Sequence, residues 1–132
     1  MSYLILGASS GLGRELANIL AKYTNDLIII SRDERDLKTI KSDLETKFKI
    51  TVKYFVLDVS SFDETKKFLE SNLNLLTAIQ GIMFPIGMIE AKDGISNEMT
   101  VSNNLIQANM GAVAYFLSKI FPIFLKKNIG TI

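Results

Sequence analysis

The sequence predicts a single α/β domain built around a parallel, doubly wound sheet. One observation is a set of short, continuously apolar runs, which are typical of strands buried on both faces. A second is that amphipathic helical patterns alternate with these runs along the chain. A third is size, because 132 residues, 48% of them hydrophobic, suffice for one core. We therefore treat residues 1–132 as one domain.

The apolar runs predict strands at residues 3–6, 27–30, 51–57 and 79–84. Helices are expected between them, because parallel strands need long crossover connections. Apolar residues recur at helical spacing in the first two intervals, at Leu12, Leu16, Ile19, Leu20 and Tyr23 and then at Leu37, Ile40, Leu44 and Phe48. Ser31 with Glu34 and Ser61 with Glu64 fit the capping-box spacing, so two helices are expected to begin at these serines.

A polar connection, residues 91–100, precedes a final helix that we expect within residues 101–127. Its stretch AVAYFLSKIFPIFL is apolar on nearly every face, which indicates that the sheet and a second copy of the chain cover it. Pro122 is expected to kink this helix or end its regular part, and Gly130 to break it. Thr131 and Ile132 then begin a fifth strand, which is cut short.

Composition excludes several classes of function. The 15 lysines and arginines and 14 acidic residues leave a net charge of +1, without the basic stripe that gathers nucleic acid. The absence of cysteine and histidine removes disulfides, thiol nucleophiles, Cys/His zinc sites and Ser-His-Asp triads, and we predict no metal site. The N-terminus lacks signal-peptide features, and no uncharged apolar run of about 18 residues occurs, so we expect a cytoplasmic protein without a membrane partner.

The first predicted strand runs into the sequence GASSGLG at the start of a helix. Gly7 permits a tight turn, Gly11 lets the backbone approach a pyrophosphate, and Gly13 lets the helix pack on the strand. The free N–H groups and positive dipole end of the helix favour an anion, assisted by Ser9 and Ser10. This pattern predicts a phosphate-binding turn.

We assign the whole turn, Leu12 included, to a dinucleotide cofactor. The alternative is that its glycines only make a tight strand-to-helix turn. A nucleoside triphosphate loop is excluded more firmly, because no Gly-Lys-Ser/Thr sequence ends the turn and Arg14 follows Gly13.

Cofactor choice depends on the end of the second strand, where an acidic residue would hold the 2′-hydroxyl of NAD. The chain has Ser31 followed by Arg32, and an arginine suits a 2′-phosphate through charge-assisted hydrogen bonds. NADP(H) is therefore favoured over NAD(H). The alternative is that Arg32 is a solvated residue at a helix start and Asp33 takes the ribose.

With GASSGLG, SRD, LDV and a late asparagine in this order, the whole chain resembles the short-chain dehydrogenase/reductase family, whose fold is Rossmann-like. The resemblance implies that Asp58 and Val59 line the adenine pocket. It also implies that the backbone of Asn109 helps to hold a water of the catalytic proton relay. Read without the family, Asp58 is a helix-side cap, Val59 is a core residue and Asn109 is a mid-helix polar residue bonded to nearby backbone.

The chain departs from the family in three places. Leu6 stands where the family usually has threonine, and Phe84-Pro85-Ile86-Gly87 replaces the family's Asn-Asn-Ala-Gly. Only Gly87 is retained there, and we assign it to the cofactor site. The family's catalytic serine and Tyr-x-x-x-Lys follow the strand that begins GTI, whereas this chain stops at Ile132, so it is C-terminally incomplete relative to the family.

These features favour an NAD(P)-dependent oxidoreductase of this family, with hydride transfer between nicotinamide and a carbonyl or alcohol substrate. The alternatives are a non-catalytic NADP(H)-binding protein and an inactive fragment. The sequence YFLSK places Tyr115 and Lys119 at the spacing of the family's catalytic pair. We interpret this pair as structural, because it lies one helix too early, although a catalytic role is the alternative.

Overall fold

The computed structural model describes residues 2–88 and 99–132, so the predicted polar connection lies almost entirely outside the described residues. The described strands form one four-stranded parallel sheet in the order β3-β2-β1-β4. The strands are β1 (Ser2–Leu6), β2 (Asp26–Ser31), β3 (Thr51–Val56) and β4 (Ile79–Met83). The four predicted strands and the parallel, doubly wound sheet are confirmed.

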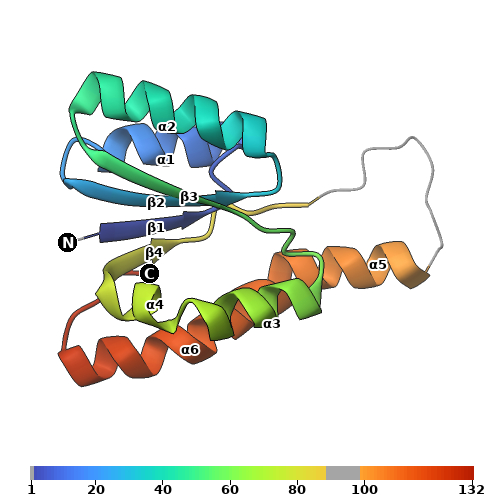
Figure 1. Ribbon diagram of the computed structural model, residues 1–132. Coiled ribbons are helices and arrows are strands. Elements are labelled where there is room, and N and C mark those ends of the chain that lie inside the picture. Colours follow the sequence, from blue (N-terminus) through green and yellow to red (C-terminus); the bar gives the residue numbers. More distant parts are fainter. Residues whose placement is uncertain (1, 89–98) are drawn as a thin grey trace.

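Helices cover both faces of the sheet (Figure 1). One layer consists of α1 (Gly11–Leu20) and α2 (Glu34–Phe48). The other consists of α3 (Phe62–Ser71), α4 (Leu73–Ala78) and a long helix made of α5 (Met99–Ile106), η1 (Gln107–Gly111) and α6 (Ala112–Lys127). Each layer has its own hydrophobic core against the sheet. This two-layer covering is why the strand sequences are apolar on both faces.

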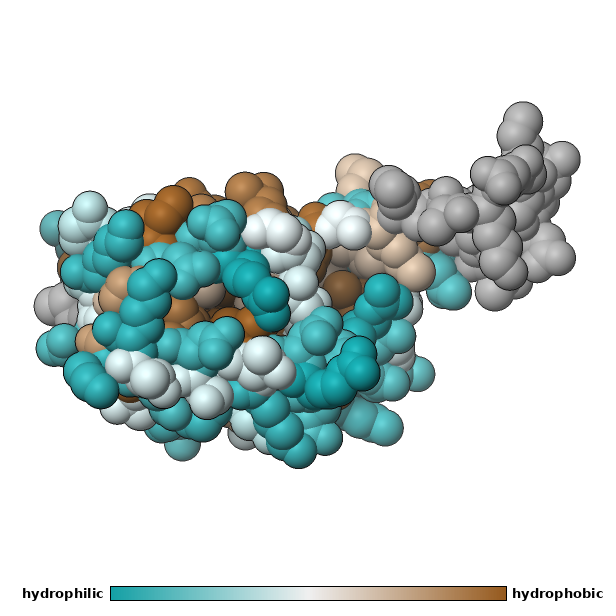
Figure 2. All heavy atoms as spheres, turned by 90° about the horizontal axis from the view of Figure 1, so that it is seen from above, coloured by the Kyte–Doolittle hydropathy of each residue, from teal (hydrophilic) through white to brown (hydrophobic). Residues whose placement is uncertain are grey.

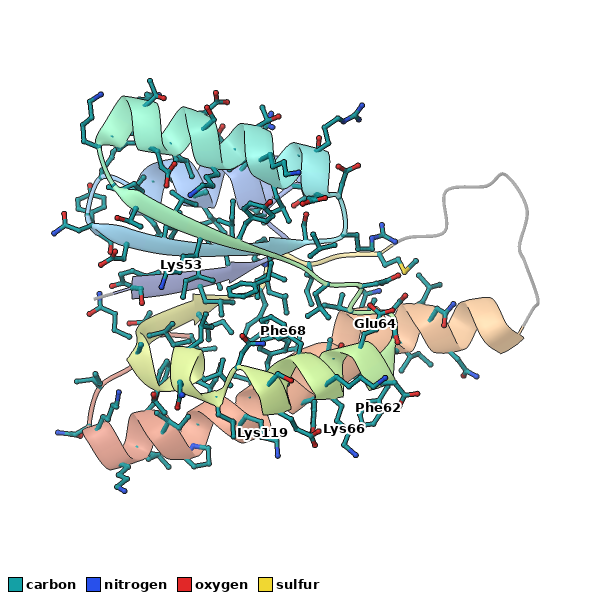
Figure 3. The ribbon with its side chains drawn as sticks, viewed as in Figure 1. Lys53, Phe62, Glu64, Lys66, Phe68 and Lys119 are labelled. Carbon is teal, nitrogen blue, oxygen red and sulfur yellow. The ribbon has the colours of Figure 1, made fainter. Side chains whose placement is uncertain are left out.

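The core beneath α6 is rich in aromatic side chains. Phe68 reaches from α3 towards the sheet, as Figure 3 shows, and its ring lies 5.3 Å from that of Phe55 and 6.2 Å from that of Phe116. Phe116, Ile120 and Phe124 form the buried stripe of α6. Their i, i+4, i+8 spacing is that of one helix face, which holds α6 against the sheet.

Helix α1 packs most closely on the sheet through small residues, while Leu16 and Leu20 are partly buried against the same core. Gly13, Ala17 and Ala21 are buried, whereas Leu12 and Tyr23 are 65% and 79% exposed. Small side chains let the helix axis approach the strands closely, which leaves the larger side chains on the flank and outer side. Figure 2 looks down on the layer of α1 and α2 and shows hydrophobic residues exposed among hydrophilic ones.

The two predicted capping boxes have different outcomes. Ser61 is the N-cap of α3 and its Oγ accepts the Glu64 N–H at 3.3 Å, as predicted. The prediction that Ser31 caps α2 is wrong, because Asp33 is the N-cap and accepts the Asp36 N–H at 3.0 Å. Ser31 instead extends β2, where its carbonyl accepts the Leu57 N–H.

Two further boundaries differ from the prediction. The crossover between β3 and β4 holds two helices rather than one, because the chain leaves helical geometry at Asn72, whose side chain donates to the Phe68 carbonyl at 2.8 Å. The last helix begins at Met99 and continues through Pro122 to Lys127. It ends at Asn128, which adopts the left-handed conformation expected of a helix C-cap, two residues before Gly130.

The predicted start of a fifth strand is confirmed. Thr131 forms a parallel bridge with Gly81, and the backbone of Thr131 bonds to both Gln80 and Ile82 of β4. The residues after α6 therefore return to the sheet beside β4. Asn103–Lys127 is also long and apolar enough to cross a membrane, by length and composition alone. In this fold its buried stripe lies on the sheet.

Candidate cofactor site

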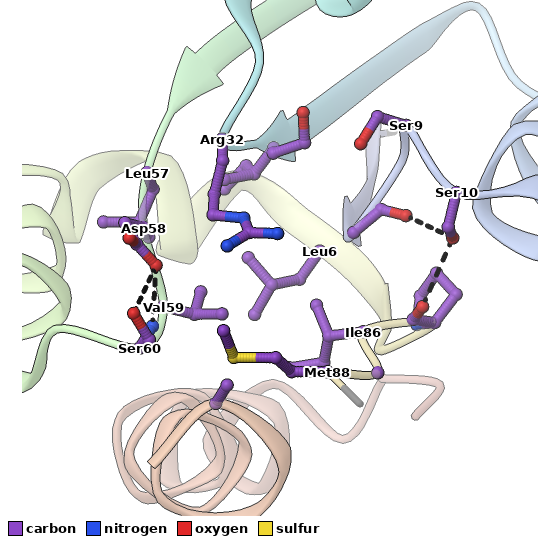
Figure 4. A pocket seen from close by; sticks show the side chains of 16 residues that line it. Leu6, Ser9, Ser10, Arg32, Leu57, Asp58, Val59, Ser60, Ile86 and Met88 are labelled. Carbon is purple, nitrogen blue, oxygen red and sulfur yellow. Dashed lines mark hydrogen bonds between the residues drawn. The ribbon is translucent and has the colours of Figure 1, made fainter. Parts of the chain in front are cut away.

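A hollow lies where the carboxyl ends of all four described strands meet (Figure 4). Its walls are the segments that follow each strand: Gly7, Ser9 and Ser10 after β1, Arg32 after β2, Leu57, Asp58, Val59 and Ser60 after β3, and Pro85, Ile86, Gly87 and Met88 after β4. Ligands of open α/β sheets bind at this edge, where the connections from neighbouring strands run to opposite faces of the sheet.

The glycine turn has the geometry that its spacing predicts. Gly7 has φ +102°, which favours glycine, and its N–H donates to the Ile30 carbonyl at 2.8 Å. A Cβ on Gly13 would lie 2.1 Å from the Gly7 carbonyl oxygen, so Gly13 permits the close approach of α1 to the turn. A Cβ on Gly11 would meet nothing within 4 Å. The backbone at Gly11 is therefore open to a ligand.

Ser10 organises the start of α1. It is the N-cap, and its Oγ accepts the Gly13 N–H at 3.3 Å and donates to the Gly7 carbonyl at 3.0 Å. The same hydroxyl lies 3.5 Å from the Pro85 carbonyl, as the dashed lines in Figure 4 show. Ser10 thus joins the glycine turn to the segment after β4, while Ser9 lines the hollow.

Ser31 and Arg32 come together at the wall made by β2. Ser31 is 7% exposed, and its Oγ is buried without a hydrogen-bond partner among the described residues. Arg32 is exposed and extends over the hollow in Figure 4. A buried hydroxyl without a partner is costly in a folded protein, so Ser31 is a candidate to bond to a ligand that enters the hollow beside Arg32.

The segment after β3 is fixed by a local turn. Asp58 Oδ1 accepts two hydrogen bonds from Ser60, one from the N–H at 3.0 Å and one from the hydroxyl at 2.7 Å. These bonds hold the carboxylate of Asp58 and the side chain of Val59, which is 9% exposed, at the edge of the hollow. Without the family, Val59 is expected in the core, and it is buried, whereas Asp58 is a turn residue and not the expected helix cap, which is Ser61. Both residues also line the hollow.

The segment after β4 is held from two sides. Asn109 Oδ1 accepts the Met88 N–H and Asn109 Nδ2 donates to the Met88 carbonyl, each at 2.8 Å. Ile86 packs tightly on Gly7, because a Cβ added to Gly7 would lie only 2.7 Å from the Ile86 side chain. Asn109 lies in the π-helical turn η1, an irregularity that is frequent at functional sites. The Asn109 side chain thus joins this turn to the backbone of Met88, which lies 21 residues earlier in the sequence.

The structure gathers most of the predicted site residues around one hollow. Eight line it: Gly7, Ser9, Ser10, Ser31, Arg32, Asp58, Val59 and Gly87. Gly11, Leu12, Gly13 and Asn109 do not line it. The sequence prediction did not assign the other lining residues to the site: Leu6, Ile30, Leu57, Ser60, Pro85, Ile86, Met88 and Ala108. Ser60 had a local signal, since it follows the predicted turn residue Asp58 by two positions.

Tyr115 and Lys119 lie outside this hollow, on α6. The Tyr115 ring is 5.4 Å from that of Phe62, and Lys119 Nζ is 5.4 Å from the centre of the Tyr115 ring. An ammonium above a phenol ring makes a cation–π contact. The pair packs α6 against α3, where Figure 3 shows Phe62 and Lys119.

The family model described as short chain dehydrogenase matches residues 2–132. The chain belongs to the short-chain dehydrogenase/reductase family. Curated members with similar sequences include a very-long-chain 3-oxoacyl-CoA reductase of Kluyveromyces lactis, 48% identical over 58 residues, which are 44% of this chain and 17% of that protein. The oxidoreductase YciK of Escherichia coli is 24% identical over 132 residues, 98% of this chain and 52% of that protein.

Solved structures of this family share the fold. The bulky-bulky ketone specific alcohol dehydrogenase of Comamonas testosteroni superposes with a TM-score of 0.87 at 22% identity, covering 98% of this chain and 51% of that one. A short-chain dehydrogenase of Sphingobium yanoikuyae in complex with NADPH has a TM-score of 0.85 at 22% identity, covering 98% and 50%. The chain thus spans about half the length of the family members that it matches throughout.

Proposed function

We propose that this chain forms the cofactor-binding part of an NADP(H)-dependent oxidoreductase that transfers hydride between nicotinamide and a carbonyl or alcohol substrate. The observation that carries the proposal is the buried Ser31 hydroxyl, which lacks a partner among the described residues and adjoins Arg32. A phosphate ester would accept hydrogen bonds from both side chains. The 2′-phosphate that distinguishes NADP(H) from NAD(H) is such a group.

The other walls of the hollow and the adjoining start of α1 fit the other parts of a dinucleotide. The open backbone at Gly11 and the N-terminus of α1 suit the pyrophosphate, because unpaired N–H groups and the helix dipole favour an anion. Asp58 and Val59 offer a polar and an apolar edge to the adenine. Gly87, where a Cβ would meet nothing within 4 Å, leaves room beside the segment after β4. Nicotinamide supplies the hydride chemistry when the cofactor is bound.

Two groups of relatives support the nature of the cofactor and the reaction. The structural neighbour from Sphingobium yanoikuyae is a complex with NADPH. Several curated relatives are very-long-chain 3-oxoacyl-CoA reductases, whose name describes the reduction of a carbonyl. Asn109, which holds Met88, would contribute to the active site by keeping η1 and the segment after β4 together.

The test is a fluorescence titration of the chain with NADPH and NADH. Arg32→Ala should weaken NADPH binding about tenfold to a hundredfold, the value of a hydrogen bond to a charged group, and leave NADH binding within about twofold. Arg35→Ala is the matched control, because Arg35 is exposed on α2 and does not line the hollow. Equal losses for both nucleotides, or none, would contradict the assignment of the 2′-phosphate.

The departure at Phe84, Pro85 and Ile86 favours a second candidate, a non-catalytic NADP(H)-binding protein. Ile86 fills space where the family has alanine, and it packs directly on the glycine turn. Binding of NADPH without oxidation by any of a broad panel of ketones, aldehydes and 3-oxoacyl thioesters would support this candidate. Hydride transfer to one of them would exclude it.

We also propose that the outer side of the long helix contacts a second copy of the chain. Phe121 and Leu125 are 52% and 66% exposed on α6, and Met110 in η1 is 68% exposed. Such large apolar side chains are stabilised when a partner covers them. Sedimentation velocity should detect a dimer at micromolar concentration that Leu125→Glu dissociates, and a monomeric wild-type chain would contradict this part of the proposal.

A further inference from the structure

Strand β3 is at the edge of the described sheet, with β2 on one side only. The N–H groups of Thr51 and Leu57 donate inward, to the carbonyls of Asn25 and Ser31. Peptide groups alternate in direction along a strand, so those of Val52, Tyr54 and Val56 face outward, away from β2. This outward row is the kind of surface to which another strand can add.

Two side chains of α2 fold over this edge and bond to Val52. Glu45 Oε1 accepts the Val52 N–H at 3.0 Å, and Lys41 Nζ donates to the Val52 carbonyl. Lys41 Nζ also donates to Glu45 Oε1 at 2.7 Å. The hydrogen bond from Lys41, followed by the one from Val52, lowers the pKa of Glu45. Both outward groups of one edge residue are thus bonded to one ion pair.

A second ion pair on α2 offers a direct comparison. Lys38 and Glu34 have the same i, i+4 spacing, with Nζ and Oε1 3.1 Å apart. Glu34 Oε1 accepts the Tyr54 hydroxyl at 3.1 Å, so this pair contacts the side chain of β3 rather than its backbone. Spacing alone therefore does not explain why Lys41 and Glu45 bond to peptide groups.

We propose that Lys41 and Glu45 block the edge of β3, so that it does not pair with β3 of a second copy of the chain. The sequence of β3, TVKYFV, is rich in the β-branched and aromatic residues that favour strands. Pairing about a twofold axis would use the outward row of each copy. With Val52 occupied, only Tyr54 and Val56 remain in that row, which is too short for a stable ladder.

The test compares the double variant Lys41→Met/Glu45→Ala with the control Lys38→Met/Glu34→Ala, which removes the same charges from the same helix. Amide exchange by NMR at low protein concentration should be about tenfold to a hundredfold faster at Val52 in the double variant and unchanged in the control. At higher concentration, sedimentation velocity should show species larger than those of the wild type only for the double variant. Slower exchange at Tyr54 and Val56 should accompany them.

Two results would overturn the proposal. One is unchanged exchange at Val52, because the bonds would then not protect this peptide group. The other is faster exchange at Val52 without association beyond the wild type, in which case the exposed Lys53 suffices to keep copies apart. Glu45→Gln, which keeps the oxygen acceptor, should behave as the wild type does and shows whether the fold tolerates change at this position.

Discussion

Gly11 and Gly13 are two residues apart, yet a methyl group added to each meets different surroundings. At position 13 the new carbon would lie 2.1 Å from the Gly7 carbonyl oxygen and 2.9 Å from the Ala8 Cα. Carbon–oxygen contacts are normally above about 3.3 Å, so α1 would have to move by roughly 1 Å. Such overpacking costs about 3 kcal/mol, against about 1 kcal/mol gained from alanine in a helix. Gly13→Ala should therefore lower the free energy of unfolding by about 2 kcal/mol.

Gly11→Ala should have the opposite effect on stability. A Cβ there meets nothing within 4 Å, and Gly11 is not among the residues with positive φ. The substitution should stabilise the chain by about 0.4–1 kcal/mol, because it restricts the unfolded chain. If the pyrophosphate approaches this backbone, the methyl group should weaken NADPH binding by about tenfold or more, which corresponds to about 1.4 kcal/mol.

Urea unfolding followed by circular dichroism gives the stability of each variant, and NADPH fluorescence gives the affinity. Gly13→Ala should be less stable than the wild type, whereas Gly11→Ala should be more stable and should bind NADPH poorly. Wild-type affinity in Gly11→Ala would show that the cofactor does not approach Gly11. Wild-type stability in Gly13→Ala would show that α1 can shift without cost, so the contact with Gly7 would not determine its position.

Three further variants test other parts of the structure. Asn109→Ala removes two hydrogen bonds to Met88 and should lower the free energy of unfolding, measured in urea titrations, by about 1–2 kcal/mol. A loss below about 0.5 kcal/mol would show that these exposed bonds do not stabilise the segment after β4. Ser61→Ala should cost about 1 kcal/mol through the lost cap of α3, while Ser31→Ala, which removes no cap, should weaken NADPH binding instead. Bonding to Lys41 and Val52 lowers the pKa of Glu45 from 4.5. The contribution of this carboxylate to stability is therefore present above pH 4.5 and is lost as the pH falls through the lower folded-state pKa. Below pH 4.5 the urea midpoint should fall more steeply for the wild type than for Glu45→Gln.

The strands and the glycine turn could be predicted because their determinants are local. Apolar runs such as residues 27–30 are buried on both faces, and this requirement is visible in the sequence itself. The positive φ of Gly7 and the close approach at Gly13 are likewise properties of a few adjacent residues. Since parallel strands end at one edge, the segments that follow them lie together. Arg32 could therefore be assigned to the site from its position after a strand, whereas Asp58 was assigned through the resemblance to the family.

Other features depend on competition between distant segments. Ser31 has the spacing of a cap, but β2 gains another bond when Leu57 pairs with Ser31, and Asp33 then caps α2. The apolar residues of α1 predict a helix correctly but only part of its buried side, because Leu16 and Leu20 are partly buried whereas close packing on the sheet selects Gly13 and Ala17 for the most buried positions. Hydrophobic periodicity identifies an amphipathic helix, whereas the distance between helix and sheet decides which residues face inward.

The segment after β4 shows why a missing motif does not by itself predict a missing structure. The family's asparagines are absent there, and Phe84, Pro85 and Ile86 stand in their place and in that of the alanine. In the fold, Asn109 bonds to Met88 from η1, Ser10 lies beside Pro85, and Ile86 packs on Gly7. Each contact joins residues that are far apart in sequence, so no local pattern reports it. Support for the segment therefore comes from the glycine turn and the last helix, and changes at either of these are expected to alter cofactor binding through this segment.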